Sequence, residues 1–303
     1  MPTVSSPAQR LLVTGGRGRL ASLIADHFRA PAHQVTLFSR GSGPGFQALS
    51  QIAEPATLAG AAAILHLAWS SLPSSAEQHP DSARKHDLPL LAGLLRALTS
   101  LPAGQRPLLV FFSSGGAIYG NAPGRPSIET DTCRPIGRYG EAKLAAENLI
   151  DRACEQAGLA CTILRISNPY GFPVPSGRAQ GIIPHAIRCA ATGQPLTLWG
   201  DGHARKDFLY YTDFLSGLDE VLNRKLTGTF NLCAGESHTV SEVIAMTEQH
   251  TSRKIAVRLS PAPPWDVQDS RLDNRRFQAA TEWCPQVSLD EGIRRSAAGY
   301  FES

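Results

Sequence analysis

Near its N-terminus the chain reads Arg10-Leu11-Leu12-Val13-Thr14-Gly15-Gly16-Arg17-Gly18-Arg19-Leu20. The apolar run that opens this stretch is typical of a buried β-strand, and the glycines that follow permit a tight turn. Apolar residues then recur at Leu20, Leu23, Ile24 and Phe28, the spacing of one helix face. A strand, a glycine turn and a helix in this order open a dinucleotide-binding unit, whose backbone N–H groups face a pyrophosphate.

Further along the chain, short apolar runs alternate with helical patterns. The alternation predicts an α/β fold, a Rossmann-like doubly wound parallel sheet covered by helices on both faces. A helix is expected over Arg84–Ser100, with Pro89 in its first turn or at a kink and with an apolar stripe of Leu91, Leu94, Leu95 and Leu98. The further expected strands are Gln34–Phe38, Ala63–Ala68, Pro107–Ser113, Ala160–Ile166 and Thr229–Ala234.

After Gly171 the composition changes, because prolines and glycines interrupt regular structure up to Pro184. We expect the chain to leave the sheet there for a smaller C-terminal substrate-binding lobe. Residues 1–170, with about 207–234, are predicted to form the NAD(P)-binding Rossmann domain, and residues 171–206 and 235–303 the smaller lobe. A cleft between the two is the expected place for a substrate.

Composition limits the classes of function. A net charge of +3 over 303 residues, with scattered basic side chains, argues against a nucleic-acid partner. The six cysteines form no CxxC pair and no metal-like cluster with histidine, so we expect mostly buried free thiols, no metal and a reducing cytoplasm. No apolar run approaches the roughly 18–20 residues that cross a bilayer, and the first ten residues lack a signal-peptide core, so we expect a soluble protein with no membrane partner.

Chemistry is indicated by Tyr139-Gly140-Glu141-Ala142-Lys143. Residues four apart on a helix lie one turn apart on the same face. An ammonium beside a phenol favours the phenolate and lowers the phenol pKa, which makes Tyr139 a candidate acid or base for an alcohol or ketone.

Together these segments resemble the extended short-chain dehydrogenase/reductase family, specifically its NAD(P)-dependent nucleotide-sugar epimerases and dehydratases. Besides the two stretches above, the matching landmarks are His66-Leu67-Ala68, Ser113-Ser114-Gly115-Gly116-Ala117-Ile118-Tyr119-Gly120, Leu164-Arg165-Ile166-Ser167-Asn168-Pro169-Tyr170-Gly171, Gly200-Asp201-Gly202, Asp207-Phe208-Leu209-Tyr210 and Asp266-Val267.

The resemblance implies a catalytic set of Tyr139, Lys143 and Ser114. In the family a serine or threonine stands four residues before the tyrosine of the Tyr119-Gly120 pair, but here that residue is Gly115, and the adjacent Ser114 is expected to serve instead. The dehydratases carry an Asp-Glu pair immediately afterwards. Here Gly116 and Ala117 stand at those positions, so dehydration is disfavoured.

The cofactor is expected to be NAD(P). At the end of the second strand, Ser39 replaces the usual aspartate of NAD-binding members and Arg40 follows it, which favours NADP, although Arg40 stacking on adenine would also suit NAD. The stretch 41–62 is shorter than the usual third strand and helix. The implied cofactor-binding residues are Gly15, Gly16, Arg17, Gly18, Arg19, Leu20, Ser39, Arg40, Leu67, Ala68, Ser113, Tyr139, Lys143 and Pro169.

For the substrate, the resemblance implies a nucleoside-diphosphate sugar, in particular a UDP-sugar. The family's diphosphate-binding arginine is Lys206 here, and a second arginine is replaced by Pro263-Pro264-Trp265, which weakens phosphate recognition. Arg178, Arg205 or Arg271 could compensate for the lost arginine. The expected substrate-binding residues are Asn168, Arg178, Leu198, Lys206, Asp266 and Arg271.

The function expected from these features is that of a nucleotide-sugar 4-epimerase, in which Tyr139 takes the proton of the sugar 4-hydroxyl during transient oxidation. A second possibility is an NADP-dependent reductase or dehydrogenase. A third, of another class, is a catalytically weak nucleotide-binding or regulatory protein on the same scaffold, which Gly115 and the missing arginine keep open.

A homodimer is expected through the helices Arg84–Ser100 and Tyr139–Ala157. Each helix is expected to bury one stripe on its own sheet, which on the second helix is Leu144, Leu149 and Ile150. The outer faces would then carry the dimer contact. Its expected residues are Leu88, Leu90, Ala92, Ala145, Ala146 and Ala153.

Overall fold

The structure is a computed structural model that describes residues 8–29, 31–41, 43–122, 124–172 and 181–301. The chain divides into two compact units, each made of three separate segments. Unit 1 comprises Met1–Ser113, Glu141–Leu164 and Val221–Thr229, and unit 2 comprises Ser114–Gly140, Arg165–Glu220 and Phe230–Ser303. The expected division into a cofactor-binding domain and a substrate-binding lobe stays a prediction.

Unit 1 is built on a seven-stranded sheet with the strand order β10-β6-β5-β4-β1-β2-β3. The pairs β1–β2, β1–β4, β2–β3 and β4–β5 are parallel. The chain order therefore reverses between β1 and β4, as in a doubly wound fold. The strands are β1 (Gln9–Thr14), β2 (His33–Ser39), β3 (Phe46–Ala48), β4 (Ala63–His66), β5 (Leu108–Ser114), β6 (Cys161–Ile166) and β10 (Gly228–Leu232).

The six strands expected from the sequence are all present, with ends within two residues of those expected. Strands β4 and β6 are buried along their whole length and β5 along all but its last residue, so each appears in the sequence as a mostly apolar run. The strand that periodicity did not indicate is β3, whose three residues are too few to show a pattern. The stretch 41–62 is short, as expected, and after β3 it holds only the turns η1 (Leu49–Ala53) and α2 (Pro55–Leu58).

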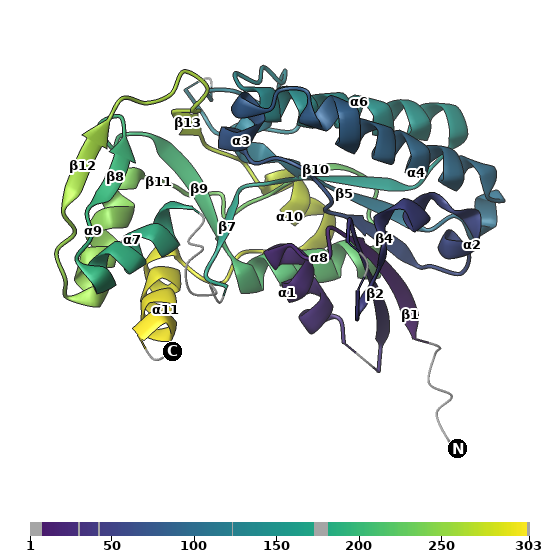
Figure 1. Ribbon diagram of the computed structural model, residues 1–303, viewed down its shortest axis with the longest axis horizontal. Coiled ribbons are helices and arrows are strands. Elements are labelled where there is room, and N and C mark those ends of the chain that lie inside the picture. Colours follow the sequence, from purple (N-terminus) through teal and green to yellow (C-terminus); the bar gives the residue numbers. More distant parts are fainter. Residues whose placement is uncertain (1–7, 30, 42, 123, 173–180, 302–303) are drawn as a thin grey trace. The chain divides into compact units, whose positions relative to one another are not determined.

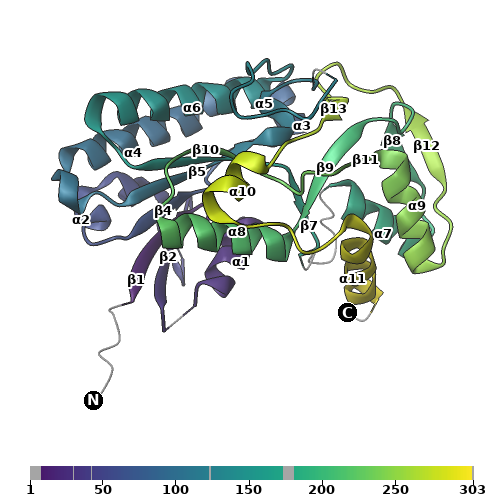
Figure 2. The ribbon, with the colours of Figure 1, turned by 180° about the vertical axis from the view of Figure 1, so that it is seen from behind.

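Helices cover both faces of this sheet (Figures 1 and 2). On one face α4 (Leu88–Ser100) and α6 (Arg138–Ala157) bury Leu91, Leu94, Leu95, Leu98 and Ile150 in the main core. On the other face α1 (Arg19–His27) buries Ala21 and Ile24. The remaining helical elements of unit 1 are α3 (Pro73–Gln78), η2 (Ala83–Asp87), η3 (Ala103–Gln105) and the end of α8 (Tyr211–Arg224).

The expected helix Arg84–Ser100 begins as a π-helical turn, η2, and becomes α-helical only at Leu88. Pro89 lies in the first turn of α4, as predicted. Because proline has no N–H, it cannot bond a carbonyl in the preceding turn, and the looser π geometry there accommodates that loss.

The stripes expected on α6 need correction. Ala146 is fully buried in the core of unit 1, so it cannot belong to an outer dimer face, whereas Leu144 and Leu149 are only half-buried. The buried stripe of α6 consists of Lys143, Ala146, Glu147 and Ile150. Leu144 and Leu149 therefore lie beside this stripe.

Unit 2 holds two smaller sheets. Strand β9 (Arg205–Tyr210) pairs with β11 (Ser237–Thr239), β13 (Asp269–Ser270) and β7 (Asn168–Tyr170), and β8 (Leu196–Trp199) pairs with β12 (Val257–Ser260). Helix α9 (Val240–Thr251) starts with a capping box, in which Thr239 and Glu242 bond each other's backbone N–H groups. The other helices are α5 (Gly115–Ile118), α7 (Ile182–Thr192), α10 (Arg275–Thr281), α11 (Leu289–Phe301) and most of α8.

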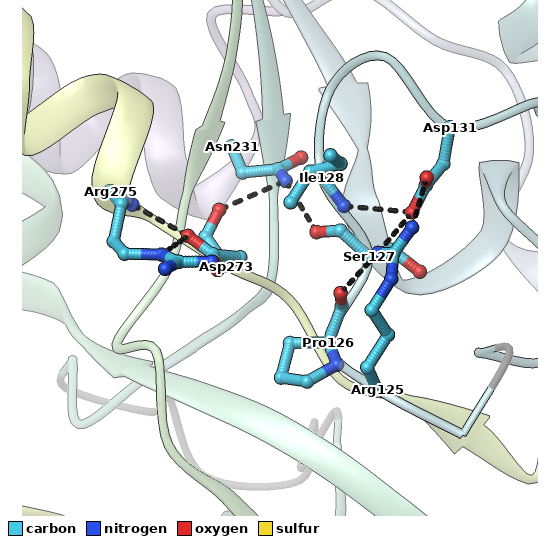
Figure 3. Close-up of polar contacts among 8 residues, drawn as sticks. All are labelled: Arg125, Pro126, Ser127, Ile128, Asp131, Asn231, Asp273 and Arg275. Carbon is cyan, nitrogen blue, oxygen red and sulfur yellow. Dashed lines mark hydrogen bonds and ion pairs between the residues drawn. The ribbon is translucent and has the colours of Figure 1, made fainter.

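A buried asparagine ties together distant segments of unit 2 (Figure 3). The side-chain amide of Asn231 donates to the carbonyl oxygens of Ser127 (2.9 Å) and Asp273 (3.1 Å), and its backbone N–H donates to Glu129 Oε1 (2.7 Å). Tyr119 Oη donates to Asn231 Oδ1 at 2.8 Å. Because Asn231 is fully buried, these bonds fix the segment around Ser127 against the chain near residue 273.

The six cysteines are all free thiols. Cys161, Cys189 and Cys233 are buried, Cys133 and Cys154 are half-buried, and Cys284 is exposed. The expectation of mostly buried thiols therefore holds for only half of them, because helical context does not distinguish an inner from an outer helix face.

Candidate functional site

The glycine turn after β1 forms a backbone cradle in unit 1. Gly15 has φ +75°, and a Cβ there would lie 3.0 Å from the backbone nitrogen of Ala68. The N–H of Gly18 donates to the carbonyl of Gly15 at 2.7 Å, and α1 begins at the next residue, Arg19. Gly18 at the N-cap offers no side-chain acceptor, so no N-cap side chain satisfies the N–H groups in the first turn of α1. Leu20 is in that first turn as well.

The ends of β1 and β4 are joined beside this cradle. Thr14 Oγ1 accepts the backbone N–H of Ala68 and lies 3.0 Å from His66 Nδ1. Burial, with a smaller contribution from the charge on Lys143, lowers the pKa of His66 to about 3, so its imidazole is neutral. Leu67 is half-buried between these two anchored residues.

At the end of β2 the structure places Arg17 close to Ser39. The Arg17 guanidinium lies 4.9 Å from the centroid of the Phe46 ring, and its Nε is 3.4 Å from Ser39 Oγ. Ser39 Oγ in turn donates to the carbonyl of Gly41. Arg40 is exposed. Residues 39–46 contain no aspartate or glutamate.

These residues fit a dinucleotide. The cradle leaves no room for a Cβ at Gly15, and α1 presents backbone N–H groups that no cap side chain bonds, as a pyrophosphate requires. Ser113 Oγ is a buried polar atom with no hydrogen-bond partner among the described residues, so it can bond a ligand.

The Lys143 ammonium lies over two aromatic rings within unit 1. It donates to the carbonyl of Phe112 at 2.8 Å and lies 3.9 Å from the Trp69 ring centroid and 4.8 Å from that of Phe111. The residue is 4% exposed. Burial lowers the pKa of Lys143 to about 7, against the charges of Asp87 and Glu147, which raise it. An amine with this pKa exchanges its charge near neutral pH.

Tyr139 precedes Lys143 by four residues in the same helix, α6. The start of α6 packs closely on α5 within unit 2, because a Cβ at Gly140 would lie 2.5 Å from the carbonyl oxygen of Ala117. This contact brings Tyr139 to the helical turn that follows Ser114.

The structure explains why Gly115 lacks the expected hydroxyl. A Cβ at residue 115 would overlap Leu272 Cδ1 and lie 3.1 Å from the carbonyl oxygen of Arg165. Leu272 is itself buried, so its side chain occupies the space of the missing serine or threonine. Ser114 is half-buried at the N-terminus of α5, and its hydroxyl makes no capping bond.

Asn168 and Pro169 lie in β7, beside β9. Asn168 Nδ2 donates to the carbonyl of Asp207 at 2.8 Å, which fixes the orientation of the amide. The Asp207 carboxylate accepts the N–H groups of Ala234 and Gly235, and burial raises its pKa to about 6.

The two expected substrate cations that lie within the described residues are already paired. Lys206 donates to the carbonyl of Val267 and lies 3.3 Å from Asp266 Oδ1. Arg271 forms a two-pronged ion pair with Asp269, with the shortest contact at 2.7 Å. Leu198 is buried in β8. Arg178 lies outside the described residues.

Three side chains near Lys143 or Gly115 were not identified from the sequence. These are Trp69 and Asp87, which act on Lys143, and Leu272, which lies against Gly115. Trp69 follows the expected landmark His66-Leu67-Ala68 directly, so its position was a usable signal. Asp87 is an acid at the start of an apolar helix, two residues before Pro89, which also sets it apart. Leu272 carries no local signal, because only the tertiary fold brings it to Gly115.

Within the described ranges, no helix is long and apolar enough to span a membrane. The same ranges contain no group of three histidine, cysteine or acidic side chains placed to hold a metal ion.

Known proteins resemble this chain along nearly its whole length. The model of the NAD dependent epimerase/dehydratase family matches residues 11–233. UDP-glucuronic acid decarboxylase 1 of Danio rerio is 26% identical over 307 residues, which cover 95% of this chain and 72% of the relative. UDP-glucose 4-epimerase of Mycolicibacterium smegmatis is 28% identical over 315 residues, which cover 95% of this chain and 97% of the relative. The crystal structure of Thermus thermophilus UDP-glucose 4-epimerase with NAD is 26% identical, covers 97% of this chain and 100% of its own, and superposes with a TM-score of 0.85.

The packing at Gly115 predicts a coupled pair of substitutions. Gly115→Ser should lower the free energy of unfolding by about 1–3 kcal/mol, because the new side chain overlaps Leu272. The double variant Gly115→Ser/Leu272→Ala should recover part of that loss relative to the sum of the two single changes, as measured in a urea-unfolding cycle. Strict additivity would contradict the contact.

Proposed function

The chain belongs to the NAD dependent epimerase/dehydratase family, and from this premise we propose that it is a UDP-sugar 4-epimerase. The strongest support comes from α6, which carries Tyr139 and Lys143 one turn apart and seats the lysine ammonium in a buried aromatic site. A named 4-epimerase that aligns over 95% of this chain supports the same activity.

In the proposed reaction Tyr139 takes the proton from the 4-hydroxyl oxygen of the sugar and later returns it. Lys143, as an ammonium, stabilises the Tyr139 phenolate and holds the nicotinamide ribose. Ser114 donates a hydrogen bond to the reacting oxygen, since Leu272 fills the space at Gly115. The nicotinamide supplies the acceptor and donor of the hydride at C4.

The substrate is proposed to be held chiefly by Asn168, whose amide is already oriented by the carbonyl of Asp207. Pairing of Lys206 with Asp266 and of Arg271 with Asp269 reduces the positive charge available to a diphosphate. We therefore expect weak ground-state binding of the UDP-sugar, with a KM toward the upper end of the usual range of about 1 μM–1 mM.

An assay with UDP-glucose and with UDP-galactose tests the activity. Interconversion of the two without net change in the 340-nm absorbance of the cofactor supports the epimerase. Stoichiometric consumption or formation of reduced cofactor identifies a reductase or dehydrogenase, and release of carbon dioxide from UDP-glucuronic acid identifies a decarboxylase. Binding of the nucleotide without any turnover would identify a binding protein.

The proton-transfer pair gives a mutational prediction. Tyr139→Phe should lower kcat by about 10²-fold or more, because the proton acceptor is lost, while calorimetric cofactor affinity stays within a few-fold of wild type. Tyr211→Phe, which removes a phenol elsewhere on unit 2, is the matched control and should keep full turnover. A Tyr139→Phe variant that turns over normally at saturating cofactor would rule out the assigned role.

We further propose a preference for NADP, which would suit a reductase or dehydrogenase as the second candidate function. Arg17 lies beside Ser39, and no carboxylate between residues 39 and 46 would repel a 2′-phosphate. Arg40 adds a second exposed guanidinium at the same strand end.

Calorimetric titration should therefore give a lower Kd for NADP than for NAD. Arg40→Asp should reverse this order, because a carboxylate repels the phosphate and accepts the ribose hydroxyls. Arg29→Asp, which makes the same charge change two residues after the end of α1, should leave the order unchanged. Tighter binding of NAD by the wild-type protein would refute the preference.

A homodimer through α4 and α6 is also proposed. Leu88, Leu90 and Ala153 are only half-buried at the edge of the core, so part of each remains to be covered. Light scattering at low micromolar concentration should return twice the chain mass of 32.5 kDa. The mass of a single chain would exclude the dimer at that concentration.

A further inference from the structure

Asp87 is a buried acid of unit 1 that the proposed reaction does not use. It is 5% exposed and ends the π-helical turn η2, whose basic residues, Arg84, Lys85 and His86, are exposed. The wide turn therefore directs one carboxylate into the core and leaves the three basic side chains outside. Turns of this kind occur frequently at functional sites.

The Asp87 carboxylate is held rigidly by Ser70, which follows β4. The Ser70 N–H donates to Oδ1 at 3.0 Å and to Oδ2 at 3.1 Å, and Ser70 Oγ donates to Oδ2 at 2.7 Å. The Ser70 hydroxyl has one proton, which it donates to the carboxylate. It therefore accepts a hydrogen bond from Ser82 Oγ, 2.8 Å away. Burial raises the pKa of Asp87, and the bonds from Ser70 oppose that rise by favouring the ionised form.

The same segment places the ring beneath Lys143. Trp69 directly precedes Ser70, and its ring centroid is 3.9 Å from the Lys143 ammonium. Anchoring Ser70 on Asp87 thus fixes the backbone that carries Trp69. Two acids favour the charge on this ammonium, Asp87 in η2 and Glu147 on α6. His66 on β4, whose own pKa the lysine lowers, is neutral and adds no charge.

Lys143 must be an ammonium to stabilise a phenolate, yet burial opposes its charge. A lysine whose pKa is about 7 is only half charged at neutral pH, so loss of one nearby negative charge would leave it mostly neutral.

We propose that Asp87 is a positioning residue for Lys143. The Asp87 carboxylate fixes Trp69 through Ser70, and its negative charge favours the ammonium form of the lysine. The inference rests on the proposed function only in that Lys143 is taken to serve the proton-transfer pair.

The chain has five lysines, so ¹³Cε-lysine labelling allows Lys143 to be followed by NMR, with assignment from the signal missing in Lys143→Arg. Asp87→Asn keeps the shape and an acceptor for Ser70 but removes the charge. It should lower the titration midpoint of Lys143 by about one pH unit or more. Asp81→Asn, at an exposed acid that pairs with Arg84, is the matched control and should leave the midpoint unchanged.

A second variant separates anchoring from charge. Asp87→Ala loses the same charge as Asp87→Asn but also removes every acceptor for the N–H and Oγ of Ser70, so the upfield ring-current shift of the Lys143 Hε protons should be smaller in Asp87→Ala than in Asp87→Asn. An unchanged midpoint in Asp87→Asn overturns the charge role, and equal Hε shifts in the two variants overturn the anchoring role.

Kinetic measurements then test whether the effect of Asp87 on Lys143 matters for turnover. The alkaline limb of the pH–kcat profile should move to lower pH in Asp87→Asn by the amount that the NMR midpoint moves, and a limb that stays in place overturns a role in the reaction. If the wild-type protein turns over no UDP-sugar, the proposed function fails, but the two NMR measurements still decide whether Asp87 controls Lys143.

Discussion

The close approach of two backbones at Gly15 is the constraint on which unit 1 depends. Strand β1 has to turn at once into α1 while its last residue, Thr14, bonds the end of β4. A positive φ at residue 15 and the absence of a Cβ allow both. Helix α1 begins directly after that turn, and the segment that leads from β4 to Trp69 packs against it at Leu67 and Ala68.

Stability and chemistry oppose each other at Lys143. A lysine is among the side chains least often buried, and the fold compensates with a backbone carbonyl, two aromatic rings and nearby acids. A fully solvated lysine would keep a pKa near 10.5, and folding would carry no cost for burying its charge. The buried one is poised between two charge states, which is what a group that works on a neighbouring proton needs.

Continuous apolar strands and the glycine turn made most of unit 1 predictable, since burial on both faces leaves a strong pattern in β4, β5 and β6. Short elements such as β3, α5 and β7 were not, because three or four residues show no period. Within the candidate site, the sequence identified residues near the ends of strands and on α6. It did not identify pairings set by tertiary contact, such as Leu272 with Gly115 and Asp87 with Ser70. The ion pairs of Lys206 with Asp266 and of Arg271 with Asp269 were not foreseen either, although Asp266 itself had been named. Local patterns report which face of an element is apolar, and they carry no information on which distant side chain fills a given gap.

The bonds of Asn231 also bear on how the protein is made. The side-chain amide of Asn231 bridges the carbonyl oxygens of Ser127 and Asp273. The ribosome must add about 146 residues after Ser127 before Asp273 is made. At roughly 5–20 residues per second, that is a wait of about 7–30 s on the ribosome. The early part of unit 2 emerges long before its partners, with the apolar surface around Tyr119 and Ile118 uncovered. Nascent chains of this protein therefore pass through a prolonged state that is open to chaperones, and slower translation between residues 127 and 273 would lengthen it.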